Sequence, residues 1–196
     1  MNAINPDKNF WSARYNENET GWDFGTITTP LKNYIDQIKD QSISILIPGA
    51  GNSHEAEYLF KNGFKNCTVL DIAEEPLQNI QNRIPDFPLE QLICGDFFEH
   101  KGNYDLILEQ TFFCALYPSL RKLYAEKMSE LLKQGGKLVG VLFNDKMNDN
   151  EPPFGGSADE YRNYFSPYFN FNVFEACYNS IEKRSGRELF IVLEKK

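Results

Sequence analysis

The sequence predicts an α/β fold, a mainly parallel sheet of seven strands with helices on both of its faces. Three observations predict it. Short apolar runs that suit buried strands alternate with segments of helical periodicity, the connections between them are short, and a glycine turn joins the first strand to the helix that follows. Repeated strand–helix units of this kind place parallel strands side by side and pack the helices over them.

The strands are predicted from the apolar runs. Five are expected in order at residues 42–49, 66–73, 89–98, 104–110 and 136–143. Two more, at residues 172–178 and 188–195, flank a charged, hairpin-like stretch at residues 182–187. Each run is short enough to form one buried strand.

The helices are predicted from periodicity and from capping signals. They are expected over residues 53–62, 74–84 and 119–134 and in the segment after Ser157. Asn52 with Glu55, and Ser157 with Glu160, could each form a capping box at the start of a helix. Gly63 stands where glycine commonly ends a helix, and a glycine pair is expected to end the third helix.

Composition and charge exclude several classes of function. The 196 residues are expected to form one domain, and the net charge of −8 argues against a nucleic acid or an anionic membrane as partner. No apolar run approaches the roughly 20 residues that span a bilayer, and the first residues lack the pattern of a signal peptide. The four cysteines are scattered without partners at metal-ligand spacing, so we expect no metal. We therefore expect a reduced, cytoplasmic protein, with a monomer favoured.

An aromatic segment precedes the first strand. The residues before position 43 form no sheet-like run, but they include Phe10, Trp11, Tyr15, Trp22 and Phe24. Such a segment, about residues 1–40, would suit a lid over a binding site. The same rings could instead pack in the core.

The candidate site lies at the carboxyl ends of the strands. In an open parallel sheet, ligands bind at this edge, beside the switch point at the first strand. The residues expected there are Gly49, Gly51, Asp71, Asp96, Phe97 and Glu109. Asp71 ends the second strand about 20 residues past the turn, where a carboxylate can accept hydrogen bonds from ribose hydroxyls. Asp96 could take an adenine amino group beside a ring that stacks on the base.

Each of these residues also has a simpler explanation. The glycines can form no more than a tight turn, Asp71 can be a solvated strand end, and Asp96 can cap a turn. Their position at the ends of successive strands favours a nucleotide site.

The charge of the candidate site indicates which nucleotide it would bind. His54 stands where a dinucleotide fingerprint has its third glycine, and no Lys or Arg lies in the glycine loop. Neutral and acidic strand ends suit a ligand with a sulfonium and an ammonium group better than a pyrophosphate. The sequence therefore predicts S-adenosylmethionine as the cofactor. A nicotinamide-dependent oxidoreductase on a similar sheet is the alternative.

The chain also resembles a known family. The resemblance is carried, from about Phe10 to the C-terminus, by FWSARYNENETGWDFGTITTPL, LIPGAGNSHEAEYL, VLDIAEEPL, GDFF, YDLILEQTFFCALYPSLRKLY, LLKQGGKLVGVLF and PPFGGSADEY. In these motifs the chain is similar to the thiopurine S-methyltransferase family, and within it to the plant thiol/halide-ion methyltransferases more than to the mammalian drug-metabolising enzymes. The resemblance implies a class I, Rossmann-like methyltransferase fold, with S-adenosylmethionine as methyl donor and the aromatic segment folded over it.

The resemblance further implies roles for individual residues. It places cofactor contacts at Trp11, Tyr15, Trp22, Gly49, Gly51, Asp71, Ile72, Asp96, Phe97 and Glu109 or a neighbour of it. The chain departs from the plant pattern at Tyr15, where a second tryptophan is usual, and at Glu151, where a glycine usually precedes PPF. A third departure is Glu109–Gln110, where Asp-Tyr is frequent.

The implied acceptor is a small molecule with a soft nucleophile, namely a thiol, a thiocyanate-like ion or a halide. Methyl transfer from a sulfonium is an in-line displacement, which requires the protein to hold the attacking atom about 3 Å from the methyl carbon. A soft nucleophile needs no strong general base. A cofactor-binding protein without catalysis, or one with another acceptor such as a metalloid, is a third interpretation.

Candidate acceptor residues follow the fourth strand. Arg121 could attract or orient an anionic acceptor, or it could be a solvated residue in the first turn of a helix. The candidate pocket walls are Phe112, Phe113, Phe154 and Tyr161. Core packing is an equal alternative for Phe112 and Phe113.

Overall fold

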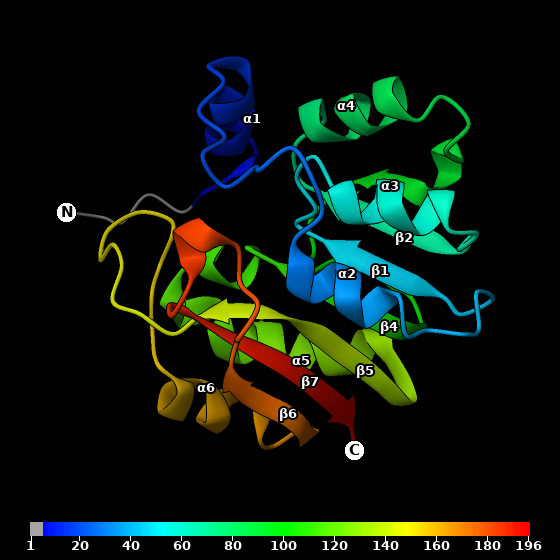
Figure 1. Ribbon diagram of the computed structural model, residues 1–196. Coiled ribbons are helices and arrows are strands. Elements are labelled where there is room, and N and C mark those ends of the chain that lie inside the picture. The colour runs from blue at the N-terminus through cyan, green and yellow to red at the C-terminus, as the bar shows by residue number, and fades with distance from the viewer. Residues whose placement is uncertain (1–5) are drawn as a thin grey trace.

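Seven strands form one sheet in the spatial order β3-β2-β1-β4-β5-β7-β6 (Figure 1). The computed structural model describes residues 6–196, so residues 1–5 of the predicted lid lie outside the described residues. The strands are β1 (Ile45–Pro48), β2 (Cys67–Asp71), β3 (Leu92–Cys94), β4 (Tyr104–Gln110), β5 (Leu132–Phe143), β6 (Phe169–Ala176) and β7 (Glu188–Lys195). Strands β1 to β5 run parallel, whereas β7 pairs antiparallel with both β5 and β6. The prediction of a seven-stranded, mainly parallel sheet is confirmed.

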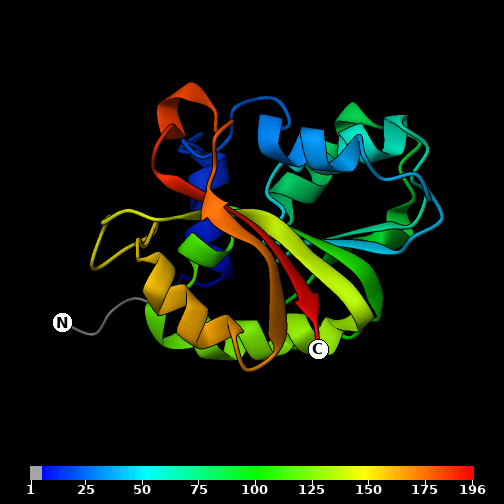
Figure 2. The ribbon, with the colours of Figure 1, turned by 60° about the horizontal axis from the view of Figure 1, so that its bottom comes forward.

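Helices cover both faces of the sheet. They are α1 (Lys8–Asn16), α2 (Thr29–Ile35), α3 (His54–Lys61), α4 (Glu75–Arg83), α5 (Arg121–Leu131) and α6 (Ala158–Phe165), with short 3₁₀ turns η1 (Leu89–Gln91), η2 (Phe113–Ala115), η3 (Pro118–Leu120) and η4 (Glu182–Arg184). Figure 2 shows α2, α3 and α4 on one face and α5 and α6 on the other, while α1 stands beside α4. In the described part of the chain, no helix has the length and apolar character needed to cross a membrane.

The core consists of two clusters of buried side chains, one on each face of the sheet. Alternation along β1 supplies both clusters, because successive side chains of a strand point to opposite faces. Leu46 joins the cluster under α5 and α6, and Ile45 and Ile47 join the cluster under α2 to α4. All four residues of β1 are buried, which is why the strand is a continuous apolar run in the sequence.

Some predicted boundaries are wrong. The third strand covers only Leu92–Cys94, because η1 precedes it and the chain turns directly after it. Helix α5 ends at Leu131, and the glycine pair lies inside β5 instead of ending the helix. Leu132 is buried and already pairs with Tyr104 of β4, so pairing with the sheet replaces a further helical turn. Strand β6 begins earlier than predicted, at Phe169.

The capping box predicted for α6 forms on one side only. The Ser157 Oγ accepts a hydrogen bond from the Glu160 N–H at 3.3 Å, as predicted. The Glu160 carboxylate does not return to Ser157. It accepts hydrogen bonds from Arg121 at 3.0 Å and from Tyr164 at 3.1 Å. A long-range charged partner thus replaces the local partner.

Candidate functional site

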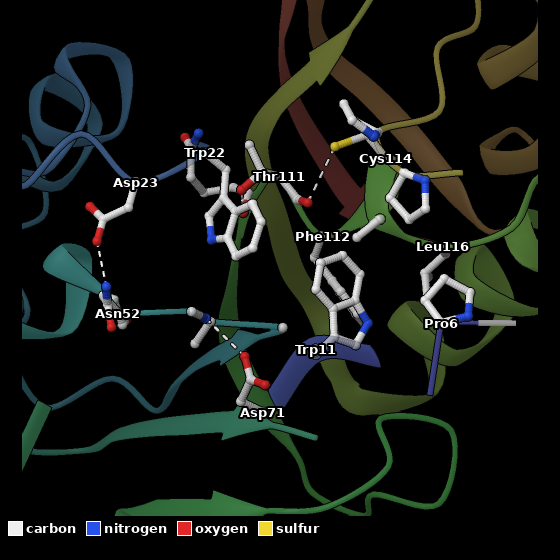
Figure 3. Close-up of a pocket in the computed structure, with 18 of the residues that line it drawn as sticks. Pro6, Trp11, Trp22, Asp23, Asn52, Asp71, Thr111, Phe112, Cys114 and Leu116 are labelled. Atoms are coloured by element: carbon white, nitrogen blue, oxygen red, sulfur yellow. Dashed lines mark hydrogen bonds between the residues drawn. The ribbon is translucent and has the colours of Figure 1, made fainter. Parts of the chain in front are cut away.

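A cavity of about 740 Å³ opens at the carboxyl ends of β1 to β4, beneath the N-terminal segment (Figure 3). Of the predicted cofactor contacts, those that line it are Trp11, Tyr15, Trp22, Gly49, Gly51, Asp71, Ile72, Asp96 and Phe97. These residues come from the N-terminal segment and from the ends of three strands. The structure therefore brings together nine of the ten residues named from the sequence and the resemblance.

The glycine loop after β1 has an unusual backbone. Gly49, Gly51 and Ser53 have φ angles of +55°, +54° and +42°, all in the left-handed region. A Cβ at Gly49 would lie 2.1 Å from the ring of Phe112, and one at Gly51 would lie 3.1 Å from the Tyr15 hydroxyl. Glycine at these two positions therefore lets rings from two other segments approach the loop.

The capping box predicted for α3 does not form. Ser53, not Asn52, is the N-cap, and its side chain makes no capping bond because its backbone is left-handed. The Asn52 side chain, which lines the cavity, donates to Asp23 and accepts from Asn79 at 2.9 Å. The Ser53 Oγ is buried and has no hydrogen-bond partner within residues 6–196, and Ser53 lines the cavity.

Asp71 joins the end of β2 to the glycine loop. One carboxylate oxygen accepts from the Gly51 N–H at 2.9 Å, and the other accepts from the Ala73 N–H at 2.9 Å. The side chain is not a solvated strand end, since it is 7% exposed and burial raises the pKa of its carboxyl. Figure 3 shows it beside the cavity below Trp11.

Asp96 and Phe97 line the cavity at the end of β3. The Asp96 carboxylate accepts from the Phe98 N–H at 2.8 Å, so it caps its turn and borders the cavity at the same time. The Phe97 ring packs edge-on against Phe112, with 5.1 Å between ring centroids.

The N-terminal aromatic residues face the cavity. Trp22 makes edge-to-face contacts with Trp11 and Tyr15, with ring centroids 5.6 and 5.8 Å apart. Helix α1 has no buried residue, so Trp11 and Tyr15 are not part of a hydrophobic core. They form an aromatic wall over the glycine loop.

Glu109 does not line the cavity, which corrects its assignment as a cofactor contact. It is fully buried, and one of its carboxylate oxygens accepts from the N–H groups of Phe112 at 2.8 Å and Phe113 at 3.0 Å. The other accepts from the Tyr124 hydroxyl of α5. Because side chains alternate along β4, Glu109 points toward α5 and its neighbour Gln110 borders the cavity.

Arg121 is neither an acceptor ligand nor a solvated residue, so both predictions for it are wrong. Its side chain is 1% exposed, pairs with Glu160 at 3.0 Å and donates to the carbonyl of Gly155 at 2.8 Å. Its guanidinium also stacks on the ring of Phe113, 4.8 Å from the centroid. Arg121 therefore fastens α5 to the loop that precedes α6.

Of the four predicted pocket walls, Phe112 alone lines this cavity. Phe113, Phe154 and Tyr161 are each 1% exposed. Phe113 packs in the core cluster beneath α5 and α6 because the chain after Phe112 turns away from the cavity into the 3₁₀ turn η2, and Tyr161 of α6 joins the same cluster. Phe154 packs against the ring of Tyr117 instead. Core packing, the alternative for Phe113, is what the structure shows.

The opposite end of the cavity carries positive charge that the strand-end argument missed. Lys183, Arg184 and Arg187 line it, and all three lie in the connection between β6 and β7. The Arg184 guanidinium is 4.8 Å from the ring centroid of Phe24 and 5.4 Å from that of Phe143. The charged stretch at residues 182–187 could have indicated these cations from the sequence. It reaches the cavity because β7 runs antiparallel to β5, which the sequence pattern did not predict.

Arg184 is buried and partly paired. It is 5% exposed, lies 3.4 Å from the Glu188 carboxylate and donates to the Trp22 carbonyl at 3.1 Å. Cys114 lies at the same end, where its Sγ donates to the Thr111 carbonyl at 3.2 Å. Burial raises the pKa of the Cys114 thiol to about 12, so this thiol stays protonated at neutral pH.

The cavity thus has two chemically different ends. One has a bare backbone loop with Asp71 and Asp96, and the other has one buried cation, Arg184, together with aromatic rings and a protonated thiol. No three side chains of metal-binding type come together anywhere in residues 6–196.

The chain is similar to known proteins over nearly all of its length. The thiopurine S-methyltransferase family model matches residues 6–194. The chain is 27% identical to the probable thiol methyltransferase 2 of Arabidopsis thaliana, over 80% of this chain and 71% of the relative. It is also 27% identical to thiocyanate methyltransferase 1 of Brassica oleracea, over 91% of this chain and 81% of the relative.

Solved structures share the fold. The 1,6-didemethyltoxoflavin-N1-methyltransferase of Burkholderia thailandensis, solved with S-adenosylhomocysteine, superposes with a TM-score of 0.75 at 14% identity. The match covers 96% of this chain and 87% of that chain. This likeness confirms the predicted methyltransferase fold.

Glu109 should make the stability of the protein depend on pH. Burial raises the pKa of its carboxyl from 4.5 to about 7, so between these values the folded chain binds more protons than the unfolded chain. The free energy of unfolding should therefore fall as pH rises from about 4.5 to about 7, by roughly 3 kcal/mol. Glu109→Gln keeps the shape but does not titrate, and urea unfolding at pH 5 and pH 8 should show that this component is lost.

The control is Glu126→Gln, at an exposed position of α5. It should keep the wild-type difference between the two pH values. A Glu109→Gln protein with that same difference would show that Glu109 does not titrate in this range.

Proposed function

Because the chain belongs to the thiopurine S-methyltransferase family, we propose that this S-adenosylmethionine-dependent methyltransferase acts on a small, soft anion, namely a thiolate, a thiocyanate-like ion or a halide. The observation that carries the proposal is the buried cationic and aromatic end of the cavity, which continues from the end lined by Asp71 and Asp96. The family membership also sets aside the nicotinamide alternative.

The residues at the first end fit S-adenosylmethionine. Ser53 presents a buried hydroxyl without a partner in the described residues, and the loop of residues 49–53 contains no cation that would repel a sulfonium. Asp71 would hold the ribose hydroxyls, and Asp96 with Phe97 would hold the adenine. Ser53 and the glycine loop would hold the amino-acid end, and the aromatic wall would cover it.

When bound, S-adenosylmethionine supplies a methyl group on a positively charged sulfur. Arg184 would hold the acceptor, because its buried guanidinium lines the cavity and has more N–H donors than the one directed at Glu188, 3.4 Å away. Phe24 and Phe143 flank this guanidinium, and by excluding water they strengthen its attraction for an anion. This arrangement gives Arg184 the role that the sequence had suggested for Arg121.

The chemistry requires no general base from the protein. A thiolate, thiocyanate or halide already carries the electron pair that forms the new bond. The protonated thiol of Cys114 would serve as a polarisable wall beside the acceptor and would not compete with it as a nucleophile.

An acceptor screen tests the proposal. The protein would be incubated with methyl-labelled S-adenosylmethionine and, in turn, thiocyanate, iodide, an aromatic thiol and tellurite. We expect labelled methyl thiocyanate, methyl iodide or methyl thioether. Product from tellurite alone would replace the soft-anion proposal with a metalloid acceptor, and no product from any of the four would contradict both.

Neutralising Arg184 should weaken the binding of the acceptor without weakening the binding of the cofactor. The double variant Arg184→Gln/Glu188→Gln removes both charges of the pair, so that no buried carboxylate is left unpaired. Loss of a charge-assisted contact should raise the KM for thiocyanate at least about tenfold. The dissociation constant for S-adenosylhomocysteine, measured by calorimetry, should change less than about threefold.

Arg162→Gln is the matched control, since Arg162 also stacks on a phenylalanine ring, 4.4 Å from the centroid of Phe174, but does not line the cavity. Its KM for thiocyanate should remain that of the wild type. An unchanged KM in the Arg184→Gln/Glu188→Gln protein would remove Arg184 from the acceptor site.

Two substitutions of Ser53 should separate its hydroxyl from its backbone strain. Ser53→Gly and Ser53→Ala both remove the hydroxyl, and each should raise the dissociation constant for S-adenosylhomocysteine about fivefold. Ser53→Gly also relieves the left-handed backbone, so its free energy of unfolding should exceed that of Ser53→Ala by about 1 kcal/mol. Wild-type affinity in both variants would show that the hydroxyl does not contact the cofactor.

A further inference from the structure

We propose that Asp23 is a positioning residue that fastens the N-terminal aromatic segment, residues 6–28, to the glycine loop and so holds Trp22 over the cavity. The inference rests on the proposed function only in treating this end of the cavity as the cofactor end. Neither the sequence motifs nor the family resemblance singled out Asp23.

Asp23 has more hydrogen bonds than a local turn requires. One carboxylate oxygen accepts from the Gly25 N–H at 2.7 Å and contacts the His54 Nε2 at 2.8 Å. The other accepts from the Asn52 amide, a contact visible in Figure 3. Asn52 and His54 lie 29 and 31 residues further along the chain, so two of the three partners belong to the body of the protein.

The partners of Asp23 are themselves held in place. The Asn52 side-chain oxygen accepts from Asn79 of α4 at 2.9 Å, which leaves its amide nitrogen directed at Asp23. The adjacent residue, Gly51, donates its N–H to Asp71. A continuous set of hydrogen bonds therefore runs from Asp23 through the glycine loop to the end of β2.

Little of this segment joins the hydrophobic core, since Ile27 is the one residue of 6–28 that packs against a core cluster. Helix α1 has no buried residue, and its side-chain contacts with α4 are polar, such as Ser12 with Glu75 at 2.8 Å. The Trp11 and Trp22 rings lie over a cavity instead of a core (Figure 3). Because the aromatic rings of the segment are half-buried and pack on one another outside the core, we infer that polar contacts contribute much of the free energy that orders the segment.

The contacts of Asp23 also hold Trp22, the preceding residue, in place. A Cβ at Gly51 would lie 3.5 Å from the Trp22 indole nitrogen, so the indole rests on the glycine loop. From the acceptor end of the cavity, Arg184 donates a hydrogen bond of 3.1 Å to the Trp22 carbonyl. Hydrogen bonds from His54 and Asn52 lower the pKa of the Asp23 carboxyl, which keeps this fastening charged over the whole physiological range.

The test compares Asp23→Asn with Asp40→Asn. Asp40 also accepts the N–H two residues on, from Ser42 at 2.9 Å, but its contacts stay within its own turn. In Asp23→Asn, the new amide NH₂ must face either the Asn52 amide or the Gly25 N–H, each of which donates. We expect trypsin to cleave after Arg14 about tenfold faster than in wild type, and the dissociation constant for S-adenosylhomocysteine to rise about tenfold.

Two further measurements separate positioning from general damage. The free energy of unfolding in urea should match that of Asp40→Asn, because the N-terminal segment adds little to the core. Asn52→Ala should weaken the binding of S-adenosylhomocysteine to a similar extent. The Asp23→Asn/Asn52→Ala protein should bind it no more weakly than either single variant, since both substitutions break the same contact between Asp23 and Asn52.

The inference would be overturned if the Asp23→Asn and Asp40→Asn proteins had equal trypsin cleavage rates and equal affinities for S-adenosylhomocysteine. It would also be overturned if the effects of Asp23→Asn and Asn52→Ala on that affinity were fully additive. Failure of the proposed function would look different. A wild-type protein that binds S-adenosylhomocysteine but methylates no soft anion would contradict the proposed acceptor class. The rates of trypsin cleavage after Arg14 would still decide the role of Asp23.

Discussion

The approach of Phe112 to Gly49 is the constraint on which the cavity depends. A side chain at position 49 would occupy the place of the ring, since its Cβ would lie 2.1 Å away. Glu109 fixes this ring by accepting the N–H groups of Phe112 and Phe113, and Tyr124 of α5 holds the same carboxylate. The floor of the cavity is therefore set from the far side of β4, by a buried carboxyl that does not itself line the cavity. A ring fixed there leaves the glycine loop free to present its backbone to a ligand.

The direction of β7 determines the chemistry of the other end. Because β7 runs antiparallel to β5, its first residue, Glu188, pairs with Phe143, the last residue of β5. The connection from β6 to β7 therefore lies at the same edge of the sheet as the carboxyl ends of the parallel strands. Arg184 comes from that connection, lines the cavity at the proposed acceptor end and donates to the Trp22 carbonyl. One reversed strand thus joins a cationic pocket to a fold whose parallel strand ends are neutral or acidic.

The sequence predicted those features that depend on neighbouring residues. Apolar runs predicted the strands because burial on both faces leaves its mark on each strand alone, and the residues at the ends of β1, β2 and β3 reached the cavity because the topology of a parallel sheet places them there. Glu109 was assigned to the wrong face of β4. Side chains alternate along this strand, so Glu109 points to α5 and its neighbour Gln110 points to the cavity. Arg121 and Asn52 were misread because distant partners, Glu160 and Asp23, competed with the local roles. Such partners become visible only when segments far apart in the chain are brought together.

The charge of the whole chain and the charge of the cavity act in opposite directions on the proposed acceptor. A protein with a net charge of −8 repels an anion at long range, although salt screens that repulsion beyond about 10 Å. Close to the cavity we propose the reverse effect, because the Arg184 guanidinium lies buried beside two rings, where its attraction for an anion, opposed by Glu188, acts through a medium of low dielectric constant. At the other end, the carboxylates that line the cavity are those of Asp71 and Asp96, beside the proposed cofactor position. The net charge of the chain therefore bears on a polyanionic surface as partner, whose exclusion stays a prediction, and it says nothing about a small anion. For a small anion, we expect the local placement of a few groups around the cavity to matter more than the net charge.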